Sequence, residues 1–396
     1  MVTTLLMGLM LAVSIVRAPV NAQISEPRLE AVEAVRFSIR RAANDGSGEI
    51  GDLAVDDRRR MYLLDRDGTS IVVTDSNGVR LSEIHIADSA TSQSSSGSRI
   101  GIQGDSLWVL DPVANRVTWV TKDGVLLRST TVRIEWQDSV GTRNRLAGVL
   151  ADGSYYGAPF LLSSVAARGL VELAPFLRMD ELGTVFDTLL WLNVPLYQTV
   201  AIELGPGRAS GYTAQLISDM TLFQISPAGD HVVIADRQAP STGDVHRFAV
   251  RRIGITGDTL ASVRVPYVPI RLTEAILDTL IRRRFQKAAP FGGRVDIETY
   301  RAALWKPRYL PPLEDLRVGI DRSIWLDELT IEHAHDRGRE WLVVTPALDG
   351  RFRVTLPDDF VVMEASLHDV WGVWMDRTGA HTIGRYRLFR SPRRDV

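Results

Sequence analysis

The stretch IGDLAVDDRRRMYLLDRDGTSIVVTDSNGVRL, residues 50–81, contains three short apolar runs separated by Asp, Gly and Asn. A similar stretch, IGIQGDSLWVLDPVANRVTWVTKDGVLL, follows at residues 100–127. YLLD at 62–65 in the first unit aligns with WVLD at 108–111 in the second, 46 residues later. Val, Ile, Trp and Tyr favour strands, and Asp-Gly or Asn-Gly favours hairpin turns. Each unit therefore predicts strand, turn, strand, turn and strand.

The aromatic position of this unit recurs along the chain, and we call the residues that occupy it the anchors. They are Tyr62, Trp108, Tyr155, Val233, Trp325 and Trp371. A large ring suits a strand that packs between neighbouring sheets. Repetition at this period indicates small sheets arranged radially. We therefore predict an all-β fold, a six-bladed β-propeller of four-stranded antiparallel blades, formed by residues 23–396 as a single domain.

Three segments lie outside the repeats. Residues 272–285, LTEAILDTLIRRRF, have apolar residues at helical spacing with Thr273 as the cap. We interpret residues 266–316 as a helical and Pro-rich insertion between blades four and five, packed over one face. Residues 31–39, AVEAVRFSI, predict a strand that completes the last blade and buries an exposed edge. Residues 87–98, ADSATSQSSSGS, predict a polar loop between the first two blades.

These repeats resemble those of the NHL and TolB-like six-bladed propellers, and the chain is similar to secreted bacterial six-bladed β-propeller domain proteins. The resemblance extends from about residue 30 to the end and includes RYLPPLEDLRVGIDRSIWLDE, which is similar to the Pro-rich lead into their fifth blade. Two features depart from the pattern, since Ala158 replaces the Asp after the third anchor and DRRRM replaces the usual Gly before the first. The resemblance implies a fold, whereas the function of that group is largely unknown.

The N-terminus is typical of an export signal. Residues 5–16, LLMGLMLAVSIV, form an apolar run too short to span a bilayer comfortably. VNA then precedes Gln23, which is a small-residue cleavage pattern. We predict that residues 1–22 are a signal peptide and that the protein is secreted or periplasmic, with no membrane insertion after cleavage. An uncleaved anchor is the alternative, and it would make the protein a structural subunit of the cell surface.

Composition limits the partners. The formal net charge of -2 provides no basic field that would attract nucleic acid. The basic residues are almost all Arg, with Lys only at 122, 287 and 306. The absence of Cys excludes disulfides, thiolate nucleophiles and Cys-based metal sites. We expect an unknown protein or small ligand as the partner.

The first strands of the blades should converge on the central channel and bring charged side chains together there. The predicted ligand-binding residues are Glu49, Asp52, Arg99, Arg145, Asp315 and Glu364. Acids mixed with arginines can clamp a zwitterionic or anionic ligand. Alternatively, these charges pair with one another at a wet channel mouth. His333 and His335 in EHAHD have a spacing that can chelate a metal, but HDRGRE is typical of an exposed loop, and we expect no metal site.

Catalytic signatures are missing from the sequence. It has neither a G-x-S-x-G elbow nor an H-E-x-x-H motif, and the glycines of GPGRASG at 205–211 miss the dinucleotide spacing. We therefore predict an exported, non-enzymatic binding or scaffold protein without a cofactor. The alternative is a calcium-dependent lactonase or esterase-like hydrolase. The resemblance to propeller lactonases and strictosidine-synthase-like enzymes implies a calcium held by Glu, Asn and Asp, yet only Asn144 lies near a predicted channel mouth.

Overall fold

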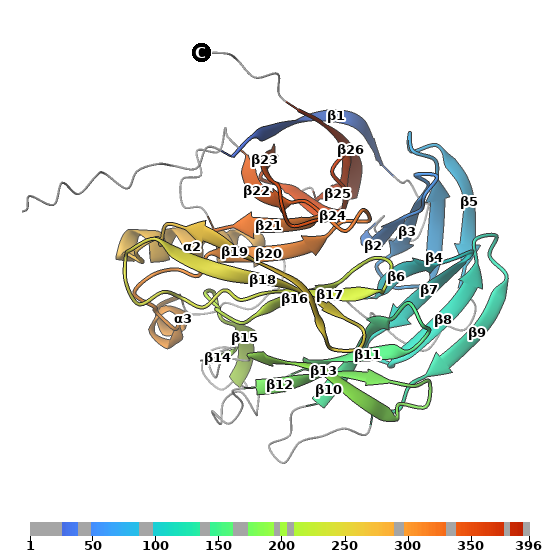
Figure 1. Ribbon diagram of the computed structural model, residues 1–396, viewed down its shortest axis with the longest axis horizontal. Helices are drawn as coiled ribbons and strands as arrows, with labels where there is room; N and C mark the ends of the chain where they lie inside the picture. The colour runs from blue at the N-terminus through green and yellow to red at the C-terminus, as the bar shows by residue number, and fades with distance from the viewer. Residues whose placement is uncertain are drawn as a thin grey trace, which may run out of the picture.

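Short antiparallel strands form most of the computed structural model (Figure 1). The structure describes residues 26–38, 49–86, 98–134, 143–160, 173–193, 199–203, 210–288, 297–329, 338–375 and 381–390. The predicted signal peptide, most of the predicted loop at 87–98, and His333 and His335 lie outside the described residues.

Four sheets each contain four strands that are consecutive in the chain and hydrogen-bonded in chain order. The first contains β2 (Ile50–Val55), β3 (Met61–Asp65), β4 (Ser70–Thr74) and β5 (Arg80–His85). The second contains β6 (Arg99–Gln103), β7 (Ser106–Asp111), β8 (Arg116–Thr121) and β9 (Leu126–Thr131). The third contains β10 (Arg143–Val149), β11 (Tyr155–Phe160), β12 (Leu173–Met179) and β13 (Val185–Asn193). The fourth contains β16 (Leu222–Ile225), β17 (His231–Ala235), β18 (His246–Gly254) and β19 (Thr259–Tyr267). A two-stranded sheet, β14 (Thr199–Glu203) with β15 (Ser210–Ala214), lies between the third and fourth in the chain.

The remaining strands form one eight-stranded sheet in the order β20-β21-β22-β23-β1-β26-β25-β24. Its strands are β1 (Arg28–Ser38), β20 (Leu313–Val318), β21 (Ile324–Glu328), β22 (Arg339–Val344), β23 (Arg351–Leu356), β24 (Phe360–Ala365), β25 (Asp369–Met375) and β26 (His381–Arg390). β1 pairs antiparallel with β26 along its length, but it meets β23 in parallel only at Arg28 and Leu29. The predicted N-terminal strand is therefore confirmed, and it pairs with the last strand of the chain.

Glycines with positive φ explain part of the repeated sequence. Gly78 and Gly124 have φ values of 81° and 91°, which favour glycine. The Gly78 amide donates to the carbonyl of Asp75, while that of Gly124 donates to the carbonyl of Thr121. These two equivalent turns connect the third strand of each unit to the fourth, as the Asn-Gly and Asp-Gly pairs predicted.

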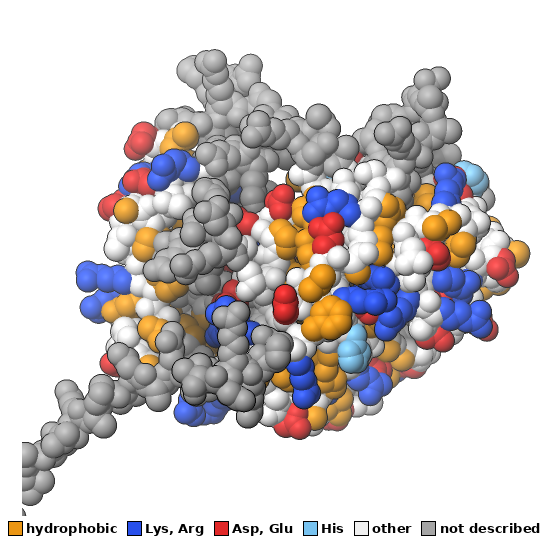
Figure 2. All heavy atoms as spheres, turned by 90° about the horizontal axis from the view of Figure 1, so that it is seen from above, with side chains coloured by type: hydrophobic (Ala, Val, Ile, Leu, Met, Phe, Trp, Pro, Cys, Tyr) orange, Lys and Arg blue, Asp and Glu red, His pale blue; other side chains and the backbone are white. Residues whose placement is uncertain are grey.

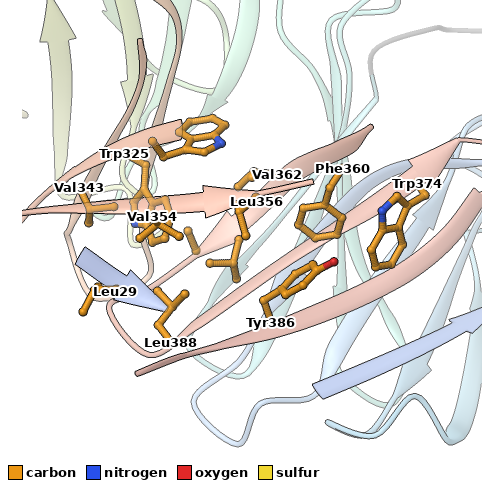
Figure 3. Close-up of a cluster of buried hydrophobic side chains, with 13 residues drawn as sticks. Leu29, Trp325, Val343, Val354, Leu356, Phe360, Val362, Trp374, Tyr386 and Leu388 are labelled. Carbon is orange, nitrogen blue, oxygen red and sulfur yellow. The ribbon is translucent and has the colours of Figure 1, made fainter. Parts of the chain in front are cut away.

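All six anchors lie on the second strand of their unit. Five of them are fully buried, and Trp108 is half-buried. Tyr62 packs in a cluster with Ile100 and Leu107 of the next sheet. Trp325 packs with Phe360, Tyr386 and other residues between the two halves of the eight-stranded sheet (Figure 3). The anchors thus contribute to the cores between neighbouring sheets.

The sheets follow one another around a centre, and the last packs against the first. Trp371, Val373 and Ile383 of the eight-stranded sheet share a cluster with Leu53 and Met61 of the first sheet. The labels of β2, β6, β16, β20 and β24 lie around the middle of the molecule in Figure 1. The architecture is therefore all-β, with few helices and a propeller-like arrangement of its sheets.

Two helices lie between β19 and β20 in the chain, α2 (Glu274–Ala288) and α3 (Ile297–Ala303). The amide of Ile276 donates to Thr273 Oγ1 at 3.3 Å, which confirms the predicted cap. Leu277 and Ile281 of α2 pack with Tyr300 of α3 in a separate small core. Both helices lie at the outer left edge of the molecule in Figure 1, and α3 contacts β14. Neither of these described helices is long and apolar enough to cross a membrane.

Candidate functional site

A cavity of about 1540 Å³ occupies the middle of the molecule. It extends to the turns that connect the first and second strands of several sheets, including residues 56–60, 104–105 and 226–228. Six polar side chains in its wall come from strands of successive sheets, and we call them the hub residues. They are Asp52 on β2, Arg99 on β6, Tyr156 on β11, Gln224 on β16, Arg317 on β20 and Glu364 on β24.

Two of the hub residues follow β-bulges. The pairing of β2 with β3 shifts between Ile50 and Asp52, and the pairing of β24 with β25 shifts between Val362 and Glu364. A bulge adds one residue to a strand and changes the direction of the side chains that follow. The two bulges are therefore part of what brings these carboxylates into the cavity wall.

Asp52 links two neighbouring sheets. Its Oδ2 atom accepts a hydrogen bond of 3.0 Å from the amide of Ile100 on β6. Burial raises the pKa of Asp52, whereas the nearby Arg99 guanidinium and the Ile100 amide oppose that rise. The carboxylate is thus fixed in position while it remains in the cavity wall.

Glu364 is the second acid among the hub residues whose pKa is raised. Its pKa lies well above the usual range because of burial and, next, because of the negative charge of Asp52; Arg317 opposes the shift. Its Oε2 atom is buried and has no hydrogen-bond partner in the part of the chain that the structure describes. Leaving a buried carboxylate oxygen without a donor is costly.

The two guanidinium groups differ in their surroundings. Arg317 is held by Asp315 on its own strand, with Nη2 to Oδ2 at 3.0 Å and Nε to Oδ2 at 3.2 Å. Arg99 is exposed. Its guanidinium group makes no hydrogen bond or ion pair with any residue that the structure describes. Of the two arginines among the hub residues, Arg99 is therefore the one without an ion pair in the described structure.

Tyr156 and Gln224 complete the wall with neutral polar groups. The Tyr156 ring stacks on Phe176 with 5.1 Å between ring centroids. Burial raises the pKa of Tyr156 to about 12, so its hydroxyl keeps its proton at neutral pH. Gln224 Oε1 accepts a hydrogen bond of 3.0 Å from the amide of Val318 on β20. This bond leaves the amide hydrogens of Gln224 as its remaining donors.

A glycine makes room for the tyrosine. Gly148 lies opposite Tyr156 on the paired strand, and a Cβ atom there would lie 2.4 Å from the tyrosine ring. The ring therefore covers the bare backbone of β10. Gly101 likewise makes room for Trp108 on the paired strand, because a Cβ atom at Gly101 would lie 2.2 Å from the Trp108 ring.

Three of the six predicted ligand-binding residues line the cavity, namely Asp52, Arg99 and Glu364. Asp315 instead holds Arg317, and Glu49 forms an ion pair with Arg66. Arg145 is not part of the cavity wall, and burial lowers its pKa. A binding role for any of these residues stays a prediction.

The sequence analysis missed Tyr156, Gln224 and Arg317. Two of these could have been found from the anchors, because Gln224 pairs with Val233 and Arg317 pairs with Trp325 across a hairpin. Glu364 pairs with the anchor Trp371 in the same way. In three of the repeated units, then, the hub residue lies directly opposite the anchor.

The cavity is a poor match for calcium. No group of three or more Asp, Glu, His or Cys side chains suitable for a metal occurs among the described residues. The two hub acids are accompanied by two arginines, whose positive charges disfavour a divalent cation, and calcium normally takes six to eight oxygen ligands. The residues present therefore do not fit the calcium site that the hydrolase alternative requires.

Comparisons with known proteins provide no identity. No family model matches the chain, and no curated protein matches it. A solved structure from the DUF4221 family of Bacteroides vulgatus is 11% identical with a TM-score of 0.47, over 92% of this chain and 100% of that one. A protein of Bacteroides fragilis NCTC 9343 described as exported is 10% identical with a TM-score of 0.45, over 95% and 98%. Virginiamycin B lyase from Staphylococcus aureus, solved with quinupristin, is 13% identical with a TM-score of 0.39, over 92% and 100%. Similarities this weak assign no activity, ligand or location to the chain.

Proposed function

We propose that this protein is an exported six-bladed β-propeller that binds a small polar ligand at its hub without covalent chemistry. The count of six follows if the eight-stranded sheet is divided at the junction of β23 and β1. Only Arg28 and Leu29 pair across that junction, and they do so in parallel. Division there leaves two antiparallel units of four strands beside the four separate four-stranded sheets.

One observation carries the proposed binding function, namely the unsatisfied polar groups in the cavity wall. Glu364 Oε2 is buried without a donor in the described structure, in the same cavity as the free Arg99 guanidinium. Such groups lower the stability of a protein unless something else binds them. A ligand with complementary groups would restore these interactions, and this supports a binding site at the hub.

Recognition is preferred over catalysis because the six hub residues of the described structure include no Ser, Thr, Cys or Lys. The acids and arginines among them are suited to hydrogen bonding and ion pairing with a ligand. The calcium-dependent hydrolase remains the competing hypothesis, and it predicts conversion of a lactone or ester. A cofactor is not required by the proposed function.

The proposed partner is a small ligand or a protein that contacts the mouth of the cavity. Nucleic acid is disfavoured by the net charge of -2, and on the face shown in Figure 2 basic and acidic side chains are mixed with hydrophobic ones. Nucleic-acid binding needs a clustered basic surface. Export is proposed from the N-terminal pattern, and the mature protein should begin at Gln23 when its N-terminus is sequenced.

The binding function can be tested by a thermal-shift screen with amino acids, dicarboxylates, amines and sugars. We expect at least one polar compound to raise Tm, because a ligand that binds only the folded state stabilises it. Arg99→Met should remove that shift, whereas Arg247→Met, at an exposed position on β18 away from the cavity, should retain it. NMR of the bound compound, with and without calcium, should show no conversion. Turnover of a lactone or ester in calcium would favour the hydrolase instead.

A further inference from the structure

The charges of the hub residues are ordered around the cavity. β16, β20, β24, β2 and β6 contact one another in that order. Their hub residues are therefore Gln224, Arg317, Glu364, Asp52 and Arg99 in succession. The two acids are neighbours, and each has an arginine on its other side.

We propose that the hub binds a small zwitterion, with a primary ammonium group between Asp52 and Glu364 and an anionic group against Arg99. This inference rests on the proposed binding function and names the chemistry of its ligand. The buried, unpartnered Oε2 atom of Glu364 is the acceptor for the ammonium group. Asp52 contributes its carboxylate from the adjacent strand, where the Ile100 amide fixes its position.

A ligand with charge of one sign fits this ring less well. A simple amine would be attracted by the acids but repelled by Arg99 and Arg317. A simple anion would be attracted by the arginines but repelled by Asp52 and Glu364. A zwitterion places each end beside groups of opposite charge, so that both Coulomb interactions are favourable. Arg317 is already paired with Asp315, so Arg99 is the guanidinium that remains for the anionic end.

Binding should release a proton. The charged groups that face Glu364 are Asp52 on β2 and Arg317 on β20, and Asp52 is also faced by Arg99 on β6. In the free protein, burial and the negative charge of Asp52 raise the pKa of Glu364 and so favour its protonated form. An ammonium group between the two acids favours the ionised form of Glu364, and the proton passes to the buffer.

Three probes with the same number of carbon atoms differ in their charges. They are γ-aminobutyrate, a zwitterion; butyrate, an anion; and butylamine, a cation. We expect γ-aminobutyrate to raise Tm more than either of the other two at the same millimolar concentration. Titration calorimetry of γ-aminobutyrate in phosphate and in Tris should give heats that differ in the direction expected for proton release to the buffer.

Glu364→Gln tests the ammonium contact. We expect this variant to bind γ-aminobutyrate at least about tenfold more weakly, the effect of losing a hydrogen bond to a charged group. It should also lose the buffer dependence of the heat. Asp52→Asn, which keeps an acceptor for the Ile100 amide, should weaken binding similarly. Glu83→Gln on β5, outside the cavity, should change neither affinity nor heat.

The outcomes distinguish the two proposals. Binding of γ-aminobutyrate no tighter than that of butyrate, or unchanged binding by Glu364→Gln, overturns the zwitterion inference alone. If butyrate or a neutral compound binds and Arg99→Met abolishes it, the binding function stands while this ligand chemistry is wrong. If no compound in either screen binds, both proposals fail.

Discussion

At the scale of single residues, the ionisable side chain with the clearest energetic consequence outside the cavity wall is Asp327. It lies on β21 with 1% of its surface exposed. Neither carboxylate oxygen has a hydrogen bond from the described residues, although Arg339 forms an ion pair with it and also contacts Glu314. Burial raises the pKa of Asp327 to about 8; Arg339 opposes the shift, and the charges of Glu314 and Asp315 add to it.

A pKa raised in the folded state makes stability depend on pH. Near pH 4 the unfolded chain releases the Asp327 proton, while the folded protein retains it up to about pH 8. The stability contributed by this residue is therefore complete below pH 4 and is lost as the pH rises to about 8. Asp327→Asn should flatten the fall in the unfolding free energy across this range, measured by urea denaturation at several pH values. Asp358→Asn, at an exposed position, should leave the slope unchanged. An equal slope in wild type and Asp327→Asn would contradict this assignment.

At the scale of strands and helices, the sequence predicted where strands lie in the chain better than it predicted which way their side chains point. The anchors located the second strand of every unit, because five of the six are large aromatic residues and these can be recognised in the sequence. The direction of a side chain on the first strand also depends on bulges, which leave no clear sequence signal. Asp315, predicted for the channel, instead holds Arg317, although the pairing of β20 shifts before Asp315 as that of β2 shifts before Asp52. A shift of one residue exchanges the two faces of a strand, and half of the hub residues were missed.

Of the two helices, one was predicted from the sequence and the other was not. The apolar spacing predicted α2, and Thr273 marked its start. The short α3 was not predicted as a helix, because seven residues give too few turns for a helical period to be recognised. Its stability comes instead from contacts such as those of the buried Tyr300 with the core that it shares with α2.

The Thr273 cap can be tested within α2 itself. Thr273→Ala removes the acceptor for the Ile276 amide and should cost about 1 kcal/mol of local stability. Thr279 lies inside the same helix, and its hydroxyl donates to the Ala275 carbonyl. Thr279→Ala should therefore be neutral or slightly stabilising, since Ala has the better helix propensity. Hydrogen exchange of the α2 amides measures both changes. Similar protection in Thr273→Ala and wild type would mean that the hydroxyl does not cap the helix.

At the scale of the whole molecule, closure depends on contacts between residues that are far apart in the chain. β1 at the blue end of the chain lies beside β26 at the red end in Figure 1. The sequence predicted this closing strand from its apolar residues and its position before the first unit. It did not predict the additional parallel contact of β1 with β23, because a two-residue pairing has no pattern of its own.

Leu29 allows the energetic role of closure to be measured. This residue is 8% exposed and packs with Val354 and Leu388, so it contacts both strands that flank β1 (Figure 3). Leu29→Ala should lower the unfolding free energy by about 2 kcal/mol, the low end for a buried leucine because the site lies near the surface. Val32→Ala, on the same strand but 45% exposed, should change it by less than about 0.5 kcal/mol. If the closed ring unfolds as one unit, Leu29→Ala should increase exchange of the slowest amides by about 30-fold even in β12, on the far side of the molecule from β1 in Figure 1. Faster exchange confined to β1, β23 and β26 would show that the sheets unfold separately and that closure stabilises only its own edge.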